Sequence, residues 1–247
     1  MPLYAYDFHI HSCLSPCGDE LMTPPNIVNM AYVKGLDIIA VTDHNSARNV
    51  RAAIKSAESI PITVVPGIEV TTAEEIHVVC LFPDADSAEM AGAKIEGSLP
   101  QIKNRPEFFG EQIIMDENET VKGAFPFLLP NACGISIDEL PKIVESFGGV
   151  CFPAHIDRQS NSVLSVFGYL PDKPEFTALE VQEPEKFFKD EANEHYRLSY
   201  EILTSSDAHR LVEISEREHF IELEEPTFNE LKRVLSRNRR ELLNFYQ

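Results

Sequence analysis

The sequence predicts an α/β protein whose strands close into a barrel, and two observations favour this class. Short apolar, β-branched segments alternate with helix-like segments along most of the 247 residues. Such alternation is typical of βα units, in which helices cover parallel strands. Seven or eight strand-like segments make a closed barrel the natural architecture, and the chain is long enough for one large domain.

The expected strands are short, and each is rich in Val, Ile, Leu or Phe. They cover residues 3–10, 37–42, 62–69, 76–82, 149–154, 177–182 and 201–205, with a last candidate at 219–223. The expected helices cover residues 24–34, 46–58, 138–147, 185–198 and 227–242. Thr23 before Pro24, and Thr227 after Pro226, are typical N-cap signals for the first and last of these helices.

The alternation is interrupted between residues 84 and 135. This segment contains a short helix-like stretch, a hairpin signal around Glu117–Asn118, and the apolar stretch AFPFLLP. We interpret it as an insertion within a single barrel domain spanning residues 1–247. It either serves a structural purpose or forms a lid over the substrate pocket, as long loops in this architecture often do.

Composition and charge narrow the expected partners and location. The formal net charge of −19 argues against binding of long nucleic acid, whose affinity comes largely from Lys and Arg. No membrane-spanning or secretory segment is evident, so we expect a cytoplasmic protein without a membrane partner. Five cysteines without framework spacing indicate reduced thiols. Cys13 and Cys17 lie close to a pair of histidines, which leaves a ligand, a redox pair and ordinary loop thiols all open.

That pair, His9 and His11, lies in the first expected strand. Side chains two residues apart on a strand point to the same face, so Asp7, His9 and His11 share one face. Buried polar groups need a partner or a ligand. We therefore expect the two histidines to share a metal ion, with Asp7 orienting one of the rings.

Further histidines and carboxylates lie at strand ends elsewhere in the chain. In a parallel barrel the carboxyl ends of all strands meet at one face, where such residues converge. The additional groups are His44, His77, His155, His209, Asp19, Asp43, Glu69 and Asp207. Imidazole and carboxylate together are typical ligands of zinc, manganese and iron, and there are enough groups for two or three ions. The alternative, a buried polar network without a metal, would be costly.

Several motifs in their order along the chain resemble the PHP (polymerase and histidinol phosphatase) family. They are DFHIHS, GLDIIAVTDHNS, GIEVTT, EIHVVCLF, PAHIDR and SSDAHR. The resemblance covers residues 3 to about 242, apart from the insertion. It implies a distorted, TIM-like (β/α)7 barrel, a centre of two or three divalent metal ions (Mn, Fe or Zn), and hydrolysis of phosphate esters.

The resemblance also implies which residues bind the metal ions. The loop after His11 is longer here than in the family, and counting back from Thr23–Pro24 assigns the family's aspartate to Asp19, whereas counting forward from His11 reaches Pro16. Arg158 resembles a basic group that some members place on the phosphate; the alternative is a surface cation. The implied ligands are His9, His11, Asp19, His44, Glu69, His77, His155, Asp207 and His209.

The function we expect is hydrolysis of phosphate esters of a small molecule or nucleotide by metal-activated hydroxide. Arg158 would bind the phosphate, and Asp207 or His209 would supply the proton for the leaving group. The runner-up is an exonuclease-like phosphodiesterase acting on short oligonucleotides. A metal-dependent C–N hydrolase and a metal-binding module without activity are further alternatives.

Overall fold

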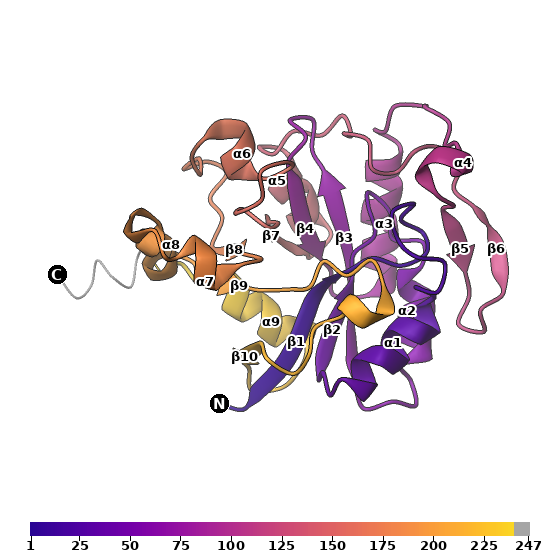
Figure 1. The fold of residues 1–247 in the computed structure, drawn as a ribbon, viewed down its shortest axis with the longest axis horizontal. Coiled ribbons are helices and arrows are strands. Elements are labelled where there is room, and N and C mark those ends of the chain that lie inside the picture. The colour runs from indigo at the N-terminus through magenta and orange to yellow at the C-terminus, as the bar shows by residue number, and fades with distance from the viewer. Residues whose placement is uncertain (240–247) are drawn as a thin grey trace.

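A curled six-stranded sheet forms the centre of the molecule (Figure 1). The computed structural model describes residues 1–239. The strands follow the order β10 (Phe220–Glu222), β1 (Leu3–Ile10), β2 (Ile38–Val41), β3 (Thr63–Thr71), β4 (His77–Leu81) and β7 (Val150–Pro153).

The direction of the strands is mixed, which corrects the expectation of a parallel sheet. β1, β2 and β3 run parallel, but β4 pairs antiparallel with both β3 and β7, and β10 pairs antiparallel with β1. The reason is local: only residues 72–76 join β3 to β4, and so short a connection makes a hairpin rather than a crossover.

Two further strands, β8 (Ala178–Glu180) and β9 (Glu201–Leu203), form a separate parallel pair. The Ile156 N–H donates to the Glu180 carbonyl at 2.8 Å, and the His11 N–H donates to the Ala208 carbonyl at 3.0 Å. These bonds draw the pair toward β7 on one side and toward β1 on the other. The result is a mixed α/β fold with a curled sheet; over the described residues, the strand pairing does not continue unbroken around a (β/α)7 barrel.

The helices are mostly shorter than expected. They are α1 (Pro24–Val33), α2 (Val50–Ser56), α3 (Ala85–Glu96), α4 (Pro106–Phe109), α5 (Leu140–Ser146), α6 (Val163–Phe167), α7 (Pro184–Phe187), α8 (Glu194–Ser199) and α9 (Phe228–Leu235). Thr23 and Thr227 cap α1 and α9 through their side chains, as predicted. The expected helix 185–198 is divided into α7, a 3₁₀ turn at residues 191–193 and α8, and residues 240–242 of the last expected helix lie outside the described residues.

The segment 84–135 consists of two parts with different packing. α3 belongs to the core, since Ala88, Ala91 and Ile95 are buried among residues of β3 and β4. The second part holds α4 and the hairpin of β5 (Ile113–Met115) and β6 (Val121–Ala124), which lie at one edge of the molecule, opposite α7 and α8 (Figure 1). The Ile113 N–H donates to the Cys13 carbonyl at 2.8 Å, so the hairpin rests on the loop that follows β1.

Both faces of β1 are buried, and this places polar side chains in the interior. Phe8 and Ile10 pack into apolar clusters on one face, while Asp7, His9 and His11 are buried on the other. Among the described helices, none has the length and apolar character needed to cross a membrane.

Candidate metal centre

Glu69, on β3, lies buried at the centre of five histidines that come from four parts of the chain. Its carboxylate is 1% exposed, and each of the five rings brings a nitrogen within 3.3 Å of one of its oxygens. The distances are 2.8 Å to His77 Nδ1, 2.9 Å to His44 Nδ1, 3.2 Å to His9 Nε2, 3.2 Å to His155 Nε2 and 3.3 Å to His11 Nε2.

Asp207 provides a second carboxylate on the side of the histidine pair. Its Oδ1 lies 3.1 Å from His11 Nε2 and 3.4 Å from His9 Nε2. Its Oδ2 contacts the guanidinium of Arg158 at 2.7 Å. His209 Nδ1 donates to the Asp207 backbone carbonyl at 2.8 Å, so Nε2 is the ring nitrogen that could act as a ligand.

The backbone at the strand ends is shaped to bring these residues together. His155 and Asp207 have φ values of 29° and 52°, in the region that residues other than glycine rarely adopt. Asn45, next to His44, has a φ of 50°, and its N–H donates to the Glu69 carbonyl at 2.8 Å. Strained backbone of this kind is concentrated at functional sites, where surrounding structure holds it in place.

The rings of His9 and His11 are oriented by outer partners. His9 Nδ1 lies 3.1 Å from both carboxylate oxygens of Glu180, so this nitrogen carries the proton. His11 Nδ1 lies 3.0 Å from Ser15 Oγ, whose own hydrogen goes to Asp43 at 2.7 Å. Ser15 therefore accepts from the ring. Each Nε2 consequently turns a lone pair toward the carboxylates at the centre.

This arrangement needs a cation. The central ring nitrogens and carboxylate oxygens are buried and lie at ion-pair distances. Several nevertheless lack any aligned hydrogen bond: His9 Nε2, His11 Nε2, His44 Nδ1, His77 Nδ1, Glu69 Oε2 and Asp207 Oδ1. Lone pairs facing carboxylate oxygens repel one another unless a proton or a metal ion lies between them.

The donor set fits divalent metals. Imidazole nitrogen with carboxylate oxygen suits zinc, manganese and iron. Three overlapping groups of side chains could each hold an ion, since their ligand atoms lie within 4.8 Å of one another. They are His9, His11 and Glu69; His44, Glu69 and His77; and His11, His44 and His209.

The buried carboxylates and imidazoles of the centre shift each other's pKa values strongly. Burial raises the pKa of Glu69, but the nearby His77, His9 and His44 lower it well below its usual range. Burial lowers the pKa of His9, but Glu180, Asp207 and Glu69 raise it well above its usual value. The protein alone thus neutralises its buried carboxylates with protonated rings, and a metal ion would take the place of these protons.

Glu180 is the functional residue that the sequence reasoning missed. Besides orienting His9, it accepts the His155 N–H at 3.1 Å, so one buried carboxylate fixes two histidines. Its place inside the expected strand 177–182, as a carboxylate between apolar residues, was a usable signal. Asp7 was expected in this role, but it instead accepts the backbone N–H groups of Ser206 and Ser215, because it lies one pleat further from the centre.

Asp19 is not brought together with the other expected ligands. It is exposed, and its carboxylate accepts the Leu21 N–H at 2.8 Å. The Cys17 thiol lies near the centre instead, close enough to His209 and His44 for both imidazoles to act on its pKa. Burial raises the pKa of the Cys17 thiol, but these two imidazoles outweigh it and lower the pKa to about 5.

Arg158, expected to bind phosphate, lies at the rim of the centre. Its side chain is 40% exposed and donates to Asp207 at 2.7 Å and to Gln182 at 2.7 Å. It is therefore positioned beside the cluster and reachable from solvent.

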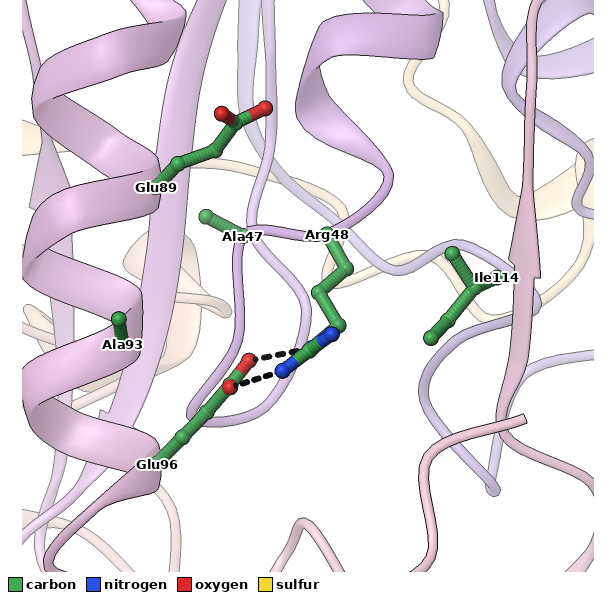
Figure 2. A pocket seen from close by; sticks show the side chains of 6 residues that line it. All are labelled: Ala47, Arg48, Glu89, Ala93, Glu96 and Ile114. Atoms are coloured by element: carbon green, nitrogen blue, oxygen red, sulfur yellow. Dashed lines mark hydrogen bonds and ion pairs between the residues drawn. The ribbon is translucent and has the colours of Figure 1, made fainter. Parts of the chain in front are cut away.

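A separate hollow of about 350 Å³ lies away from the histidines, between α3 and β5 (Figure 2). Arg48 points into it but is held by both carboxylate oxygens of Glu96, at 2.7 and 3.0 Å. Its charge is thus already neutralised within the protein.

Comparisons with known proteins agree with this geometry. The PHP domain family matches residues 7–197. A 5'-3' exoribonuclease of Haemophilus influenzae is 32% identical over 88 residues, which is 34% of this chain and 31% of the relative. A 5'-3' exoribonuclease of Salmonella typhimurium is 33% identical over 84 residues, 32% of this chain and 28% of the relative. The chain thus spans less than a third of the length of these exoribonucleases.

Solved structures share the fold at low sequence identity. The lesion-specific endonuclease Q of Pyrococcus furiosus aligns with a TM-score of 0.67 and 18% identity, over 95% of this chain and 56% of the other. A Bifidobacterium adolescentis protein assigned to the metal-dependent phosphoesterases aligns with a TM-score of 0.59 and 18% identity, over 96% and 97% of the two chains.

These findings correct the expectation of a small phosphorylated substrate without long nucleic acid. Relatives in sequence are named exoribonucleases, and endonuclease Q has been solved with a 27-mer duplex. Net charge is a poor guide to such partners, because bound metal ions can supply positive charge locally whatever the total charge of the chain. With its family matched over most of its length and a donor set suited to divalent metals, the chain belongs to the PHP domain family of metal-dependent phosphoesterases.

Proposed function

We propose that this protein hydrolyses phosphodiester bonds of nucleic acid at a centre of two or three divalent metal ions. The observation that carries the proposal is the buried ring of unpartnered histidine nitrogens around Glu69 and Asp207. Divalent metal ions bound between these groups would satisfy the ring nitrogens and the two carboxylates at once.

Eight side chains would hold the ions: His9, His11, His44, Glu69, His77, His155, Asp207 and His209. Bound divalent metals activate water as a nucleophile at neutral pH and draw charge from phosphate oxygens. Glu69 is suited to be shared between ions, since its two oxygens face different histidines: Oε1 faces His77, and Oε2 faces His44.

The protein's other residues at this site would position the substrate. Arg158 carries a planar guanidinium suited to two phosphate oxygens, and its exposed side chain reaches the rim of the site. The His209 side chain is 27% exposed, and its Nε2 can take up or release a proton at the leaving group when it is not bound to metal.

A nucleic-acid substrate is supported by the relatives and by one surface feature. Phe108 and Phe109 on α4 are 70% and 44% exposed, and Arg105 stacks on Phe108 with 4.6 Å between the guanidinium carbon and the ring centre. Gly110, directly after α4, packs against the Pro16 carbonyl in the loop that follows β1. Exposed aromatic and arginine side chains beside a hydrolytic centre can stack unpaired bases.

The test is cleavage by the manganese-supplemented protein of end-labelled single-stranded RNA, single-stranded DNA, duplex DNA with an abasic site, and a phosphomonoester. We expect cleavage of at least one nucleic acid, and the product lengths distinguish removal of terminal nucleotides from internal cutting. Glu69→Gln should lower metal content and cleavage together. Glu89→Gln, an acidic residue on the surface of α3 paired with Arg51, is the matched control and should change neither.

Intact nucleic acid after incubation with the metal-loaded protein would reject the proposal. So would cleavage that survives unchanged in Glu69→Gln while metal content falls.

A further inference from the structure

The loop that follows β1 contains Cys17, at the rim of the candidate metal centre. The residues on either side of Cys17 form hydrogen bonds with histidines of that centre. Two residues before Cys17, Ser15 Oγ accepts from His11 Nδ1 at 3.0 Å and from the His44 N–H at 3.1 Å. Two residues after it, the Asp19 N–H donates to the His209 carbonyl at 2.8 Å. The three histidines that hold this loop are those of one candidate metal group.

We infer that Cys17 binds one of the metal ions through its sulfur, alongside His11, His44 and His209. The inference rests on the metal centre of the proposed function. Each of the three rings offers a nitrogen within 4.8 Å of the other two. His209 and His44 also both lower the pKa of the Cys17 thiol, which places the sulfur beside these two rings. Buried His11 Nε2 and His44 Nδ1 have no aligned hydrogen-bond partner, so these nitrogens are available as metal ligands on this side of the centre.

Three imidazoles leave room for one more ligand in a tetrahedral site. The aspartate expected here, Asp19, is turned to the surface and occupied by the Leu21 N–H. A thiolate supplies the same negative charge as a carboxylate but is a softer ligand. It therefore shifts preference toward zinc or iron and away from manganese at this position.

The nearby Cys13 provides an internal comparison. It lies in the same loop, but its sulfur points at the Ile113 carbonyl, 3.8 Å away, and it is buried against the β5 strand. Burial raises the pKa of its thiol to about 12, so it stays protonated and is a poor ligand. Cys13→Ser is thus the matched control for Cys17→Ser.

The first experiment is titration of the full chain with Co²⁺, which reports sulfur ligation through a thiolate-to-cobalt charge-transfer band. We expect the band in the native protein and in Cys13→Ser, and its loss in Cys17→Ser. Cys17→Asp should keep the number of bound ions, measured by elemental analysis, while losing the band. It should also lower the affinity for Zn²⁺ relative to Mn²⁺.

A second experiment needs no variant, so it holds even if Cys17→Ser does not fold. Alkylation of each cysteine in the native protein is followed by peptide mass spectrometry with and without Zn²⁺. Zn²⁺ should protect Cys17, which is exposed, and leave the rate at half-buried Cys151 unchanged.

A full complement of cobalt without the band, a band that survives in Cys17→Ser, or alkylation of Cys17 at equal rates with and without Zn²⁺ would each overturn the inference. The outcome is separable from that of the proposed function. A band in a protein that cleaves no nucleic acid would reject the function alone, whereas cleavage by a metal-loaded protein without the band would reject the cysteine ligand alone.

Discussion

At the scale of single residues, the centre depends on groups that hold the histidines rather than on the histidines alone. A ligand nitrogen must present its lone pair, and the acceptor on the other ring nitrogen decides whether it does. Glu180 has this role for His9, and Ser15 with Asp43 has it for His11. The chain therefore uses buried carboxylates both inside and around the cluster.

Glu180→Gln is expected to weaken metal binding without removing a ligand. The neutral amide holds the His9 Nδ1–H less strongly, and its N–H₂ group can face the ring, so the lone pair on Nε2 is no longer fixed toward the metal. We expect a loss of metal affinity of roughly 10- to 100-fold, measured by competition with a chromophoric chelator. Glu185→Gln, an exposed carboxylate on α7, should bind metal as the native protein does. Equal affinities in the two variants would contradict the role of Glu180.

Arg158→Ala is expected to reduce turnover while leaving metal content intact. Arg158 contacts Asp207 from outside the cluster, and its exposed guanidinium can bind phosphate oxygens. Loss of one positioned donor at a site of developing charge costs on the order of 100-fold in rate. Arg158→Lys should recover only part of the activity, because an ammonium lacks the planar fork. Arg210→Ala, a surface cation paired with Glu213, is the control, and native rates in Arg158→Ala would reduce Arg158 to a surface cation.

At the scale of elements, the outer part of the segment 84–135 contacts the loop that leads from β1 toward the candidate metal centre. The hairpin and α4 contact the residues between β1 and α1, the same residues that lie over His11 and His209. A substitution in this segment should therefore change activity at the site. This makes the hypothesis of a substrate-shaping lid testable.

Gly110→Ala tests this connection. Gly110 has a φ of 98°, and a Cβ there would lie 2.0 Å from the Pro16 carbonyl oxygen, so the backbone must move. Gly168 also has a positive φ, 76°, but a Cβ there would meet nothing within 4 Å. Gly168 is in the left-handed region, where alanine costs about 1–2 kcal/mol. Gly110, with a ψ of 166°, is in a region that essentially only glycine adopts, so Gly110→Ala adds a larger backbone cost as well as the collision. We expect a larger fall in the free energy of unfolding, by urea denaturation, and a lower cleavage rate for Gly110→Ala; equal effects would mean that α4 packs loosely on the loop.

At the scale of the whole molecule, the buried centre links metal binding to stability. The metal-free protein must neutralise two buried carboxylates with protonated rings. The ligands of an ion come from several strands and loops, so they are brought together only in the folded protein. Metal should therefore stabilise the entire fold.

We expect added Mn²⁺ or Zn²⁺ to raise the melting temperature. An ion present at about 100 times its dissociation constant contributes about 2.7 kcal/mol, which corresponds to a rise of roughly 5 to 10 °C for a domain of this size. Differential scanning calorimetry with and without chelator measures this. Glu69→Gln should lose most of the rise, whereas Glu139→Gln, an exposed carboxylate before α5, should retain it. The same rise in Glu69→Gln would place the stabilising ion elsewhere.

The sequence by itself determined the residue types of the centre and most strand positions. His9 and His11 follow from the period of a strand, because the pleat is a local property. The order of the motifs along the chain added His44, Glu69 and His77, although Glu69 lies inside β3 and His77 begins β4. The α/β class also follows from local alternation, whereas the expected closed (β/α)7 barrel is replaced by a mixed, curled sheet.

Only the tertiary structure decided the contacts that join distant parts of the chain. The pairing of His9 with Glu180, the ion pair of Arg158 with Asp207, and the place of Cys17 rather than Asp19 near the centre all depend on how loops and strands pack. The free energy of each such contact depends on burial, charge and backbone strain. These involve groups that are far apart in the sequence. The sequence therefore predicts which types of side chain form the candidate centre. Tertiary packing decides which of their atoms contact one another.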